Sequence, residues 1–196
     1  MNKKDKIVKR SFDFFFSFVG LLLSWPIILI AWIIASLETK SNGMFSQTRV
    51  GENGKCFKIY KIKTMYDKKG STITTANDKR IIKSGKVFRK YKIDELPQLW
   101  NVLIGNMSFV GPRPDVPGYA DKLKGEDRII LSVKPGITGP ASIKYKNEEE
   151  ILANVKNPKE YNDNVIWPDK IRINKEYIKN WSLKKDIEYV IKTIKG

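Results

Sequence analysis

The longest hydrophobic feature of the chain is an uncharged apolar run near the N-terminus, from residue 14 to residue 37. About 20 apolar residues are enough to span a bilayer, so this segment is a membrane candidate. It is longer than the apolar region of a signal peptide, and no clear cleavage site follows it. Two topologies remain open: an ordinary spanning helix, and a re-entrant hairpin that enters and leaves on the same side.

Several features of this segment favour the hairpin. Pro26 lies near its middle and removes a helix hydrogen bond, and Ser24 can satisfy a freed backbone group. Both flanks are rich in Lys and Arg, which prefer the cytoplasmic side, and a spanning helix would have to export one of them. Asp13, at the edge of the run, suits the membrane interface better than hydrocarbon.

After residue 40 the pattern becomes that of a basic α/β domain. Residues 54–66 alternate between apolar and polar and predict a strand, with Phe57, Ile59, Lys61 and Lys63 on one face. The two lysines either face solvent or line a phosphate site.

A polar loop over 68–80 and a helix follow this strand. Asp78 is the expected N-cap of a helix that runs to about Lys90, with Ile81, Ile82 and Phe88 inward. Arg89 lies near the C-terminal end of this helix, where the helix dipole also favours a cation.

A second amphipathic helix is predicted from spacing, with an apolar stripe formed by Leu96, Leu99, Trp100 and Leu103. Pro97 is tolerated only in the first turn, so the helix should begin at about Asp94 or Glu95 and end at Gly105. Two adjacent acids are therefore expected at a helix N-terminus.

Two Pro/Gly-rich segments and a final helix complete the pattern. The loop 109–118 holds Arg113 between two prolines, which suits phosphate binding, and the turn 133–140 holds Thr138. Ser182 can cap the last helix, whose apolar stripe is formed by Ile187, Val190, Ile191 and Ile194. That stripe fits either core packing or a helix lying on the membrane.

These elements predict a helix-rich α/β fold with a small sheet and an N-terminal re-entrant helix–break–helix hairpin. The expected domains are a membrane hairpin over 1–40 and a cytoplasmic domain over 41–196, including C-terminal interfacial amphipathic helices.

Charge and composition narrow the chemistry. The chain carries 37 Lys and Arg against 21 Asp and Glu, a formal charge of +16, which indicates an anionic partner. It has no histidine and one cysteine, Cys56, so His-based catalysis, an intramolecular disulfide and Cys-rich zinc sites are excluded. It also lacks a P-loop, a G-x-G-x-x-G fingerprint and a G-x-S-x-G elbow.

The acid pair has two interpretations. Asp94 can be a simple N-cap, with Glu95 complementing the helix dipole. Alternatively, the pair serves phosphoryl-type transfer, because Mg²⁺ is commonly held by carboxylates plus substrate phosphates and an Asp can attack phosphorus. In that case the dipole and nearby cations are expected to keep Asp94 ionised.

The order of several sequence blocks resembles the bacterial sugar transferases, the monotopic polyprenol-phosphate phosphoglycosyltransferases, in their short single-domain form. The similar blocks are "KRSFDFFFS" (9–17), "FSQTRVG" (45–51), "FKIYKIKTM" (57–65), "IDELPQLWNVLIGNMSFVGPRP" (93–114), "VKPGITGPA" (133–141) and "YIKNWSLKKDIEYVIKTI" (177–194). In place of the Ser-Pro pair of the family's helix break, this chain has Trp25 and Pro26.

The resemblance implies an enzyme of the inner membrane, with its catalytic domain on the cytoplasmic face. It implies a Mg²⁺-dependent transfer of a sugar 1-phosphate from a UDP-sugar to polyprenol phosphate, which initiates surface glycan assembly and releases UMP. The sugar, the glycan product and the oligomeric state are not implied, and no nucleic acid is expected.

The resemblance also implies roles for individual residues. Asp94 is the expected nucleophile and Glu95 the Mg²⁺ ligand, while the expected substrate-binding residues are Lys61, Lys63, Arg89, Arg113 and Thr138. The alternative is a non-catalytic, membrane-anchored basic module that binds anionic lipid or nucleic acid. That alternative leaves the acid pair and the rigid Arg113 loop unexplained.

Overall fold

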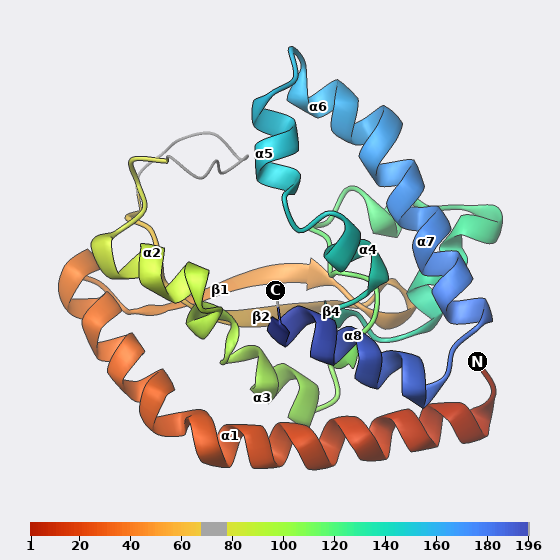
Figure 1. The fold of residues 1–196 in the computed structure, drawn as a ribbon, viewed down its shortest axis with the longest axis horizontal. Coiled ribbons are helices and arrows are strands. Elements are labelled where there is room, and N and C mark those ends of the chain that lie inside the picture. Colours follow the sequence, from red (N-terminus) through yellow and green to blue (C-terminus); the bar gives the residue numbers. More distant parts are fainter. Residues whose placement is uncertain (68–77, 196) are drawn as a thin grey trace.

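The computed structural model describes residues 1–67 and 78–195 and places one long helix against a mixed body of short helices and strands (Figure 1). The first elements are α1 (Lys3–Thr39), β1 (Met44–Val50), η1 (Glu52–Gly54), β2 (Cys56–Ile62), α2 (Lys83–Lys90), η2 (Ile93–Glu95), α3 (Gln98–Leu103) and β3 (Ser108–Val110). The remaining elements are η3 (Ala120–Lys122), η4 (Gly125–Ser132), β4 (Gly136–Thr138), α4 (Pro140–Lys144), α5 (Glu148–Ala153), α6 (Pro158–Tyr161), η5 (Asn162–Ile166), α7 (Trp167–Lys179) and α8 (Leu183–Lys195).

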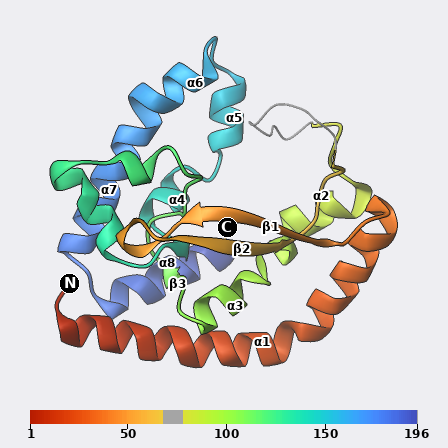
Figure 2. The same ribbon diagram turned by 180° about the vertical axis from the view of Figure 1, so that it is seen from behind.

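Helix α1 does not break at Pro26, so the expected helix–break–helix is wrong in this respect. The helix runs unbroken through 37 residues, and it bends so that its C-terminal part turns up around the body (Figures 1 and 2). A proline can be accommodated by a bend when tertiary contacts hold both sides of the helix. Ser24 does not supply the expected backbone bond, because its buried Oγ has no partner among the described residues.

Both ends of α1 pack against the same body. Near the N-terminus, the buried carboxylate of Asp13 accepts hydrogen bonds from Ser108 Oγ at 3.0 Å and from Phe109 N at 3.1 Å. Asp13 therefore anchors the helix to β3. The sequence suggested a place at the membrane interface, but the carboxylate is buried within the protein. Near the C-terminus, Ala31 and Ala35 join a cluster with Ile62, Ile82 and Phe88.

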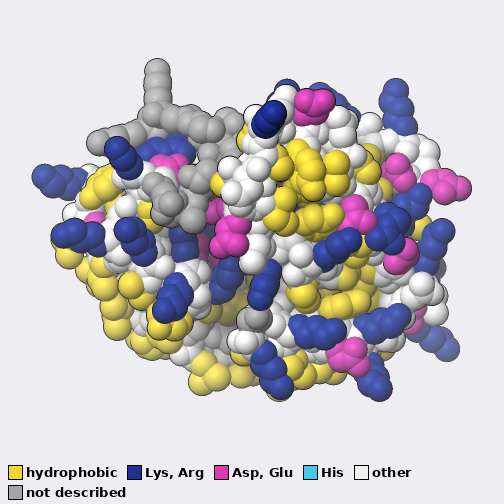
Figure 3. Space-filling model, turned by 45° about the horizontal axis from the view of Figure 1, so that its top comes forward, with side chains coloured by type: hydrophobic (Ala, Val, Ile, Leu, Met, Phe, Trp, Pro, Cys, Tyr) yellow, Lys and Arg dark blue, Asp and Glu magenta, His cyan; other side chains and the backbone are white. Residues whose placement is uncertain are grey.

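The outward side of α1 is an apolar surface. Over the described residues, α1 is the one helix long and apolar enough to cross a membrane. Figure 3 shows hydrophobic side chains along the lower margin and many Lys and Arg side chains across the face above. The large exposed apolar residues of α1 are Ile7, Val8, Phe14, Phe15, Phe16, Phe18, Leu22, Leu23, Trp25, Ile27, Leu29, Ile30, Trp32, Ile33, Ile34 and Leu37.

The predicted strand is β2, and it pairs with a strand that the sequence analysis did not predict. Strands β1 and β2 form an antiparallel hairpin with Met44 opposite Ile62 and Val50 opposite Cys56. Both faces of β2 are partly covered, since Ile62 contacts the α1–α2 cluster whereas Ile59 packs with Val102. Because both faces are partly covered, buried and exposed residues do not strictly alternate along β2.

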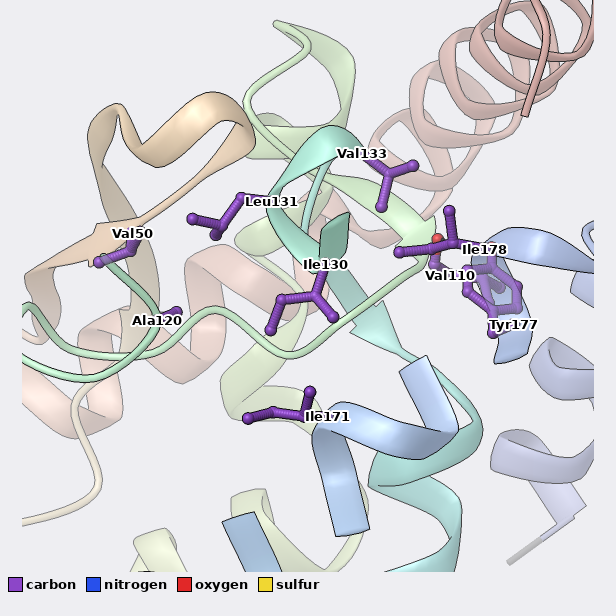
Figure 4. Close-up of a cluster of buried hydrophobic side chains, with 9 residues drawn as sticks. All are labelled: Val50, Val110, Ala120, Ile130, Leu131, Val133, Ile171, Tyr177 and Ile178. Atoms are coloured by element: carbon purple, nitrogen blue, oxygen red, sulfur yellow. The ribbon is translucent and has the colours of Figure 1, made fainter. Parts of the chain in front are cut away.

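The Pro/Gly-rich segments contribute to a short parallel pair, β3 with β4, beside the main core (Figure 4). A Cβ on Gly136 would lie 2.1 Å from the backbone nitrogen of Gly111, so only glycine allows this approach. The core next to it consists of Val50, Val110, Ala120, Ile130, Leu131, Val133, Ile171, Tyr177 and Ile178.

The helix boundaries correct one prediction and confirm another. Asp78 does not cap α2; its carboxylate binds the backbone and guanidinium of Arg80, and Ile82 occupies the N-cap position. Asp78 lies too far before Lys83 to reach the free backbone N–H groups of the first turn. The predicted loop over 68–80 falls largely outside the described residues. At α8, Ser182 Oγ accepts from Lys185 N at 3.3 Å, which confirms the expected cap.

The apolar stripe of α8 is largely exposed. Ile187, Ile191 and Ile194 lie open, while Val190 packs against the core. Of the two interpretations left by the sequence, core packing therefore accounts for Val190 but not for the three isoleucines.

Candidate active site

The two acids lie in a 3₁₀ turn, η2, one turn before the regular helix. The sequence placed the helix start at Asp94 or Glu95, but α3 begins at Gln98 with Pro97 as its N-cap residue. Turn η2 follows Lys92, which adopts a left-handed conformation with φ 57°. Because Asp94 precedes the helix by a full turn, its carboxylate cannot be the N-cap of α3.

Asp94 is a buried carboxylate without a full set of partners. The residue is 9% exposed, and Oδ1 has no hydrogen-bond partner in the described part of the chain. Burial raises the pKa of Asp94, and Glu95 raises it further, although Lys61, Lys92 and Arg89 act in the opposite direction. The cations thus favour the ionised form as expected, but burial outweighs them in the direction of the pKa shift.

Glu95 has the opposite environment. Its Oε1 atom contacts Lys61 Nζ at 2.8 Å and Arg113 Nη2 at 3.7 Å. Burial alone would raise the pKa of Glu95, but Lys61 and Arg113 outweigh it and lower the pKa to about 2. For Lys61, burial is the largest influence and lowers the pKa despite its partner. The result is an ionised Glu95 directly beside an Asp94 whose Oδ1 has no hydrogen-bond partner in the described part of the chain.

Three of the predicted binding residues thus lie around the acid pair. Lys61 at the end of β2 and Arg113 on the proline loop contact Glu95, and the Arg113 side chain is 54% exposed and so open to a ligand. Arg89 on α2 acts electrostatically on Asp94 and is held by bonds from Nε to Thr64 Oγ1 and from Nη2 to Met65 Sδ.

The other two predicted residues have different partners. Lys63 Nζ donates to Asp67 Oδ2 at 2.7 Å and to Ser41 Oγ at 2.9 Å. Thr138 is buried and its hydroxyl pairs with Thr193 of α8 at 2.6 Å. The described contacts therefore do not bring Lys63 or Thr138 to the carboxylates.

Arg49 is a residue of the site that sequence analysis treated only as basic flank. From β1 its Nη1 donates to Pro114 O at 3.2 Å, and the neighbouring Val50 N donates to Asp115 O at 2.9 Å. On the other side, Gly136 N donates to Pro112 O at 2.8 Å. These bonds fix the loop that presents Arg113. In the sequence, Arg49 is marked only by its place in the block "FSQTRVG" (45–51), and β1, which positions it, was not predicted.

Asp115 adds a second perturbed carboxyl next to Arg113. Burial raises the pKa of Asp115 to about 6, although Lys170, Arg49 and Arg113 oppose the rise. The site thus combines cations and carboxyls of unequal acidity, which is typical of functional sites.

The acid pair offers oxygen ligands of the type that a divalent cation takes. No cluster of three Asp, Glu, Cys or His side chains occurs in residues 1–67 and 78–195, so a protein-only cage is not present there. Mg²⁺, however, is often held by one or two carboxylates plus substrate phosphates. The unpartnered Oδ1 of Asp94 and the second oxygen of Glu95 fit such a ligand.

Comparison with known proteins identifies the family. The model for the bacterial sugar transferases matches residues 4–196. The uncharacterized sugar transferase EpsL of Bacillus subtilis is 35% identical over 190 residues, covering 96% of this chain and 86% of its own length.

Two longer relatives carry more specific names. The UDP-N-acetylgalactosamine-undecaprenyl-phosphate N-acetylgalactosaminephosphotransferase of Aeromonas hydrophila is 34% identical over 194 residues, covering 96% of this chain and 43% of its own length. The UDP-glucose:undecaprenyl-phosphate glucose-1-phosphate transferase of Escherichia coli is 33% identical over 197 residues, covering 97% and 40%. With a family match over nearly its whole length, the chain belongs to the bacterial sugar transferases.

Proposed function

We propose that this protein transfers a sugar 1-phosphate from a UDP-sugar to a polyprenol phosphate, with Asp94 as the nucleophile. The observation that carries the proposal is the buried, unpartnered Oδ1 of Asp94 next to Glu95 and its two cations, in a chain of this family. Two relatives are named for transfer from a UDP-sugar to undecaprenyl phosphate, which supports the same donor and acceptor classes here. Family membership also weighs against a non-catalytic basic module.

In the first step, an Asp94 carboxylate oxygen attacks the phosphorus that carries the sugar. An Asp94 O–P bond forms while the bond from that phosphorus to the bridging oxygen breaks, and UMP leaves with the oxygen and its electron pair. Arg113, exposed and held on a fixed loop, binds the diphosphate oxygens and stabilises their charge. Lys61 keeps Glu95 ionised and oriented.

In the second step, a phosphate oxygen of the polyprenol phosphate attacks the phosphorus held on Asp94. The Asp94 O–P bond breaks, the carboxylate is regenerated, and a polyprenol diphosphate sugar leaves. Glu95, with Asp94, would hold Mg²⁺. When bound, Mg²⁺ would neutralise part of the negative charge of the donor diphosphate.

Membrane association follows from the apolar outer side of α1. We propose that α1 is re-entrant, that the body over 41–196 lies on the cytoplasmic face of the bacterial inner membrane, and that the product feeds surface glycan assembly. The proposal is supported by the bent helix, whose two ends pack against one body (Figure 1).

The direct test of the chemistry uses donor alone. Incubation of the wild-type chain with a panel of UDP-sugars should release UMP and leave a phospho-sugar adduct on the Asp94 peptide, detected by mass spectrometry. Asp94→Asn should abolish this adduct, and with polyprenol phosphate added it should lower turnover more than about 1,000-fold, because the nucleophile is lost.

Asp127→Asn serves as the matched control, since this acid lies in an exposed ion pair on η4 and should retain turnover and adduct. Release of UDP in place of UMP would assign the chain to another class of glycosyl transfer. Full activity of Asp94→Asn would remove Asp94 from the mechanism.

A further inference from the structure

A second group of cations lies beyond the other end of α3, away from the acid pair. Arg10 of α1 donates to Val102 O and Leu103 O, both at 2.6 Å, and so covers the last carbonyls of α3. Lys134, from the turn before β4, reaches the same place. Its Nζ lies 3.0 Å, and the Arg10 guanidinium 3.4 Å, from the position that a Cβ on Gly105 would occupy.

The contacts of Lys134 differ from those of Arg10. Among the residues that the structure describes, none forms an ion pair or hydrogen bond with its Nζ. Burial lowers the pKa of Lys134, and Arg10 and Lys6 lower it further, while Glu52 and Asp13 act in the opposite direction. Burial first, and then the neighbouring Arg10 and Lys6, therefore disfavour the charge of this half-buried ammonium.

The neighbouring acids are already occupied. Glu52 pairs with Lys6 at 3.3 Å, and Asp13 accepts from Ser108 and Phe109. Arg10 has five N–H donors. Its hydrogen bonds to the carbonyls of Val102 and Leu103 use only some of them. A fixed guanidinium and an ammonium that has no ion-pair partner among the described residues thus lie at one point, an arrangement that binds an anion.

The surroundings identify the kind of anion. The Arg10 guanidinium lies 5.8 Å from the centre of the exposed ring of Phe14, where the apolar run begins. Ile7 and Ile104 are also large exposed apolar residues close in sequence to these groups. A cationic site at the edge of an apolar, membrane-sized helix suits a phosphate at the level of lipid headgroups.

We propose that Arg10 and Lys134, with Lys6 nearby, form a binding site for the phosphate of an anionic phospholipid headgroup. The site is separate from the acid pair and does not depend on sugar transfer. Its role is to hold α1 and the α3 end at a fixed depth in the interface. Because α3 directly follows the turn that carries Asp94, the bound lipid also sets the height of the acid pair above the membrane.

The test measures lipid binding by the full chain in neutral detergent micelles. Dioleoyl phosphatidylglycerol should raise the thermal midpoint in a saturable manner, and dioleoyl phosphatidylcholine should not. Lys134→Gln should weaken the apparent affinity for phosphatidylglycerol about fivefold, as expected for one Lys at a membrane surface. Lys134→Arg should restore it.

Lys156→Gln is the matched control, because it removes one exposed positive charge between α5 and α6, across the body from α1 (Figure 1). It should bind the lipid as the wild type does. Equal affinity of Lys134→Gln and wild type would overturn the proposal, as would equal shifts with both lipids. An equal shift with inorganic phosphate alone would assign the site to free anions and overturn the lipid assignment.

A second measurement needs no variant and covers the case in which Lys134→Gln does not fold. In the wild type, phosphatidylglycerol should protect Lys134 from acetylation by acetic anhydride, while Lys156 is modified at an unchanged rate. Unprotected Lys134 at saturating phosphatidylglycerol would equally contradict the proposal. Neither readout involves UDP-sugar turnover, so failure here is distinguishable from failure of the proposed function.

Discussion

At the residue scale, two adjacent carboxyls differ because their partners differ. Glu95 has Lys61 and Arg113 within 3.7 Å, whereas Asp94 Oδ1 has no hydrogen-bond partner among the described residues. A buried carboxyl without partners binds its proton more tightly, while a paired one releases it. The same two letters of sequence therefore yield one group that stays ionised and one that titrates at higher pH.

This difference predicts the acid limb of the activity profile. Because the nucleophile must be ionised and its pKa lies above 3.8, kcat/KM should rise with pH through the raised pKa of Asp94. Lys61→Met removes a cation that opposes the rise, so the limb should move to higher pH. Lys58→Met, an exposed neighbour in β2, should leave the limb in place. A limb that moves to lower pH in Lys61→Met would contradict this electrostatic picture.

Arg49 should affect the donor through the loop that it holds. Arg49→Gln removes the bond to Pro114 O, so the KM for the UDP-sugar should rise about tenfold, the typical loss for one hydrogen bond from a charged group. The pH of the acid limb should not change, since Asp94 keeps its neighbours. Arg49→Lys should recover part of the loss. A change in kcat alone would exclude a positioning role in donor binding.

At the scale of elements, a buried ion pair connects the first helix to the last. Lys9 Nζ of α1 lies 2.5 Å from Asp186 Oδ2 of α8, and Asp186 also accepts from Tyr177 and Trp181. Asp186 is 1% exposed. From sequence alone, Asp186 had no assigned role, and Lys9 was only part of the basic N-terminal flank. Both are inward because each finds its counter-charge on a distant element.

Breaking this pair should destabilise the body. Asp186→Asn leaves Lys9 buried and uncompensated, so the free energy of unfolding should fall by ~3–5 kcal/mol in urea titrations of micellar protein. Lys9→Met combined with Asp186→Asn should recover part of it. Asp127→Asn breaks a more exposed pair with Lys175 and should cost less than ~1 kcal/mol. Equal losses in the two single variants would show that burial of the Lys9 pair adds nothing.

At the scale of the whole molecule, the bend of α1 is the feature on which the proposed re-entrant topology rests. A straight helix of 37 residues would separate its ends by about 55 Å at 1.5 Å per residue. Instead, the contacts of Asp13 at one end and of Ala31 and Ala35 at the other hold both parts on one body (Figure 2). An ordinary spanning helix would have to break one of these sets of contacts.

The topology prediction follows directly. In a Cys56→Ser background, Asn2→Cys and Lys156→Cys should both react with a membrane-impermeant thiol reagent only after the cytoplasmic side is opened. Labelling of Asn2→Cys from outside intact cells would establish a spanning helix. A second variant, Pro26→Leu, should be combined with Asn2→Cys. Removing the proline favours a straight helix, so labelling of Asn2→Cys from outside the cell should increase.

The sequence by itself determined the features that depend on local pattern or on residue type. These are the apolar helix, the strand within 54–66, the Ser182 cap, the exclusion of histidine chemistry and the family of the chain. Each follows from nearest-neighbour sterics, burial periodicity or motif order, which require no knowledge of distant contacts.

Only the tertiary structure decided which groups meet. It decided that α1 continues through Pro26, that Asp94 precedes α3, and that Thr138 faces Thr193 and not the acid pair. It also decided the raised pKa of Asp94, because desolvation depends on what covers a carboxyl in space. Burial and charge are sums over neighbours distant in sequence, so they exist only once the chain has folded.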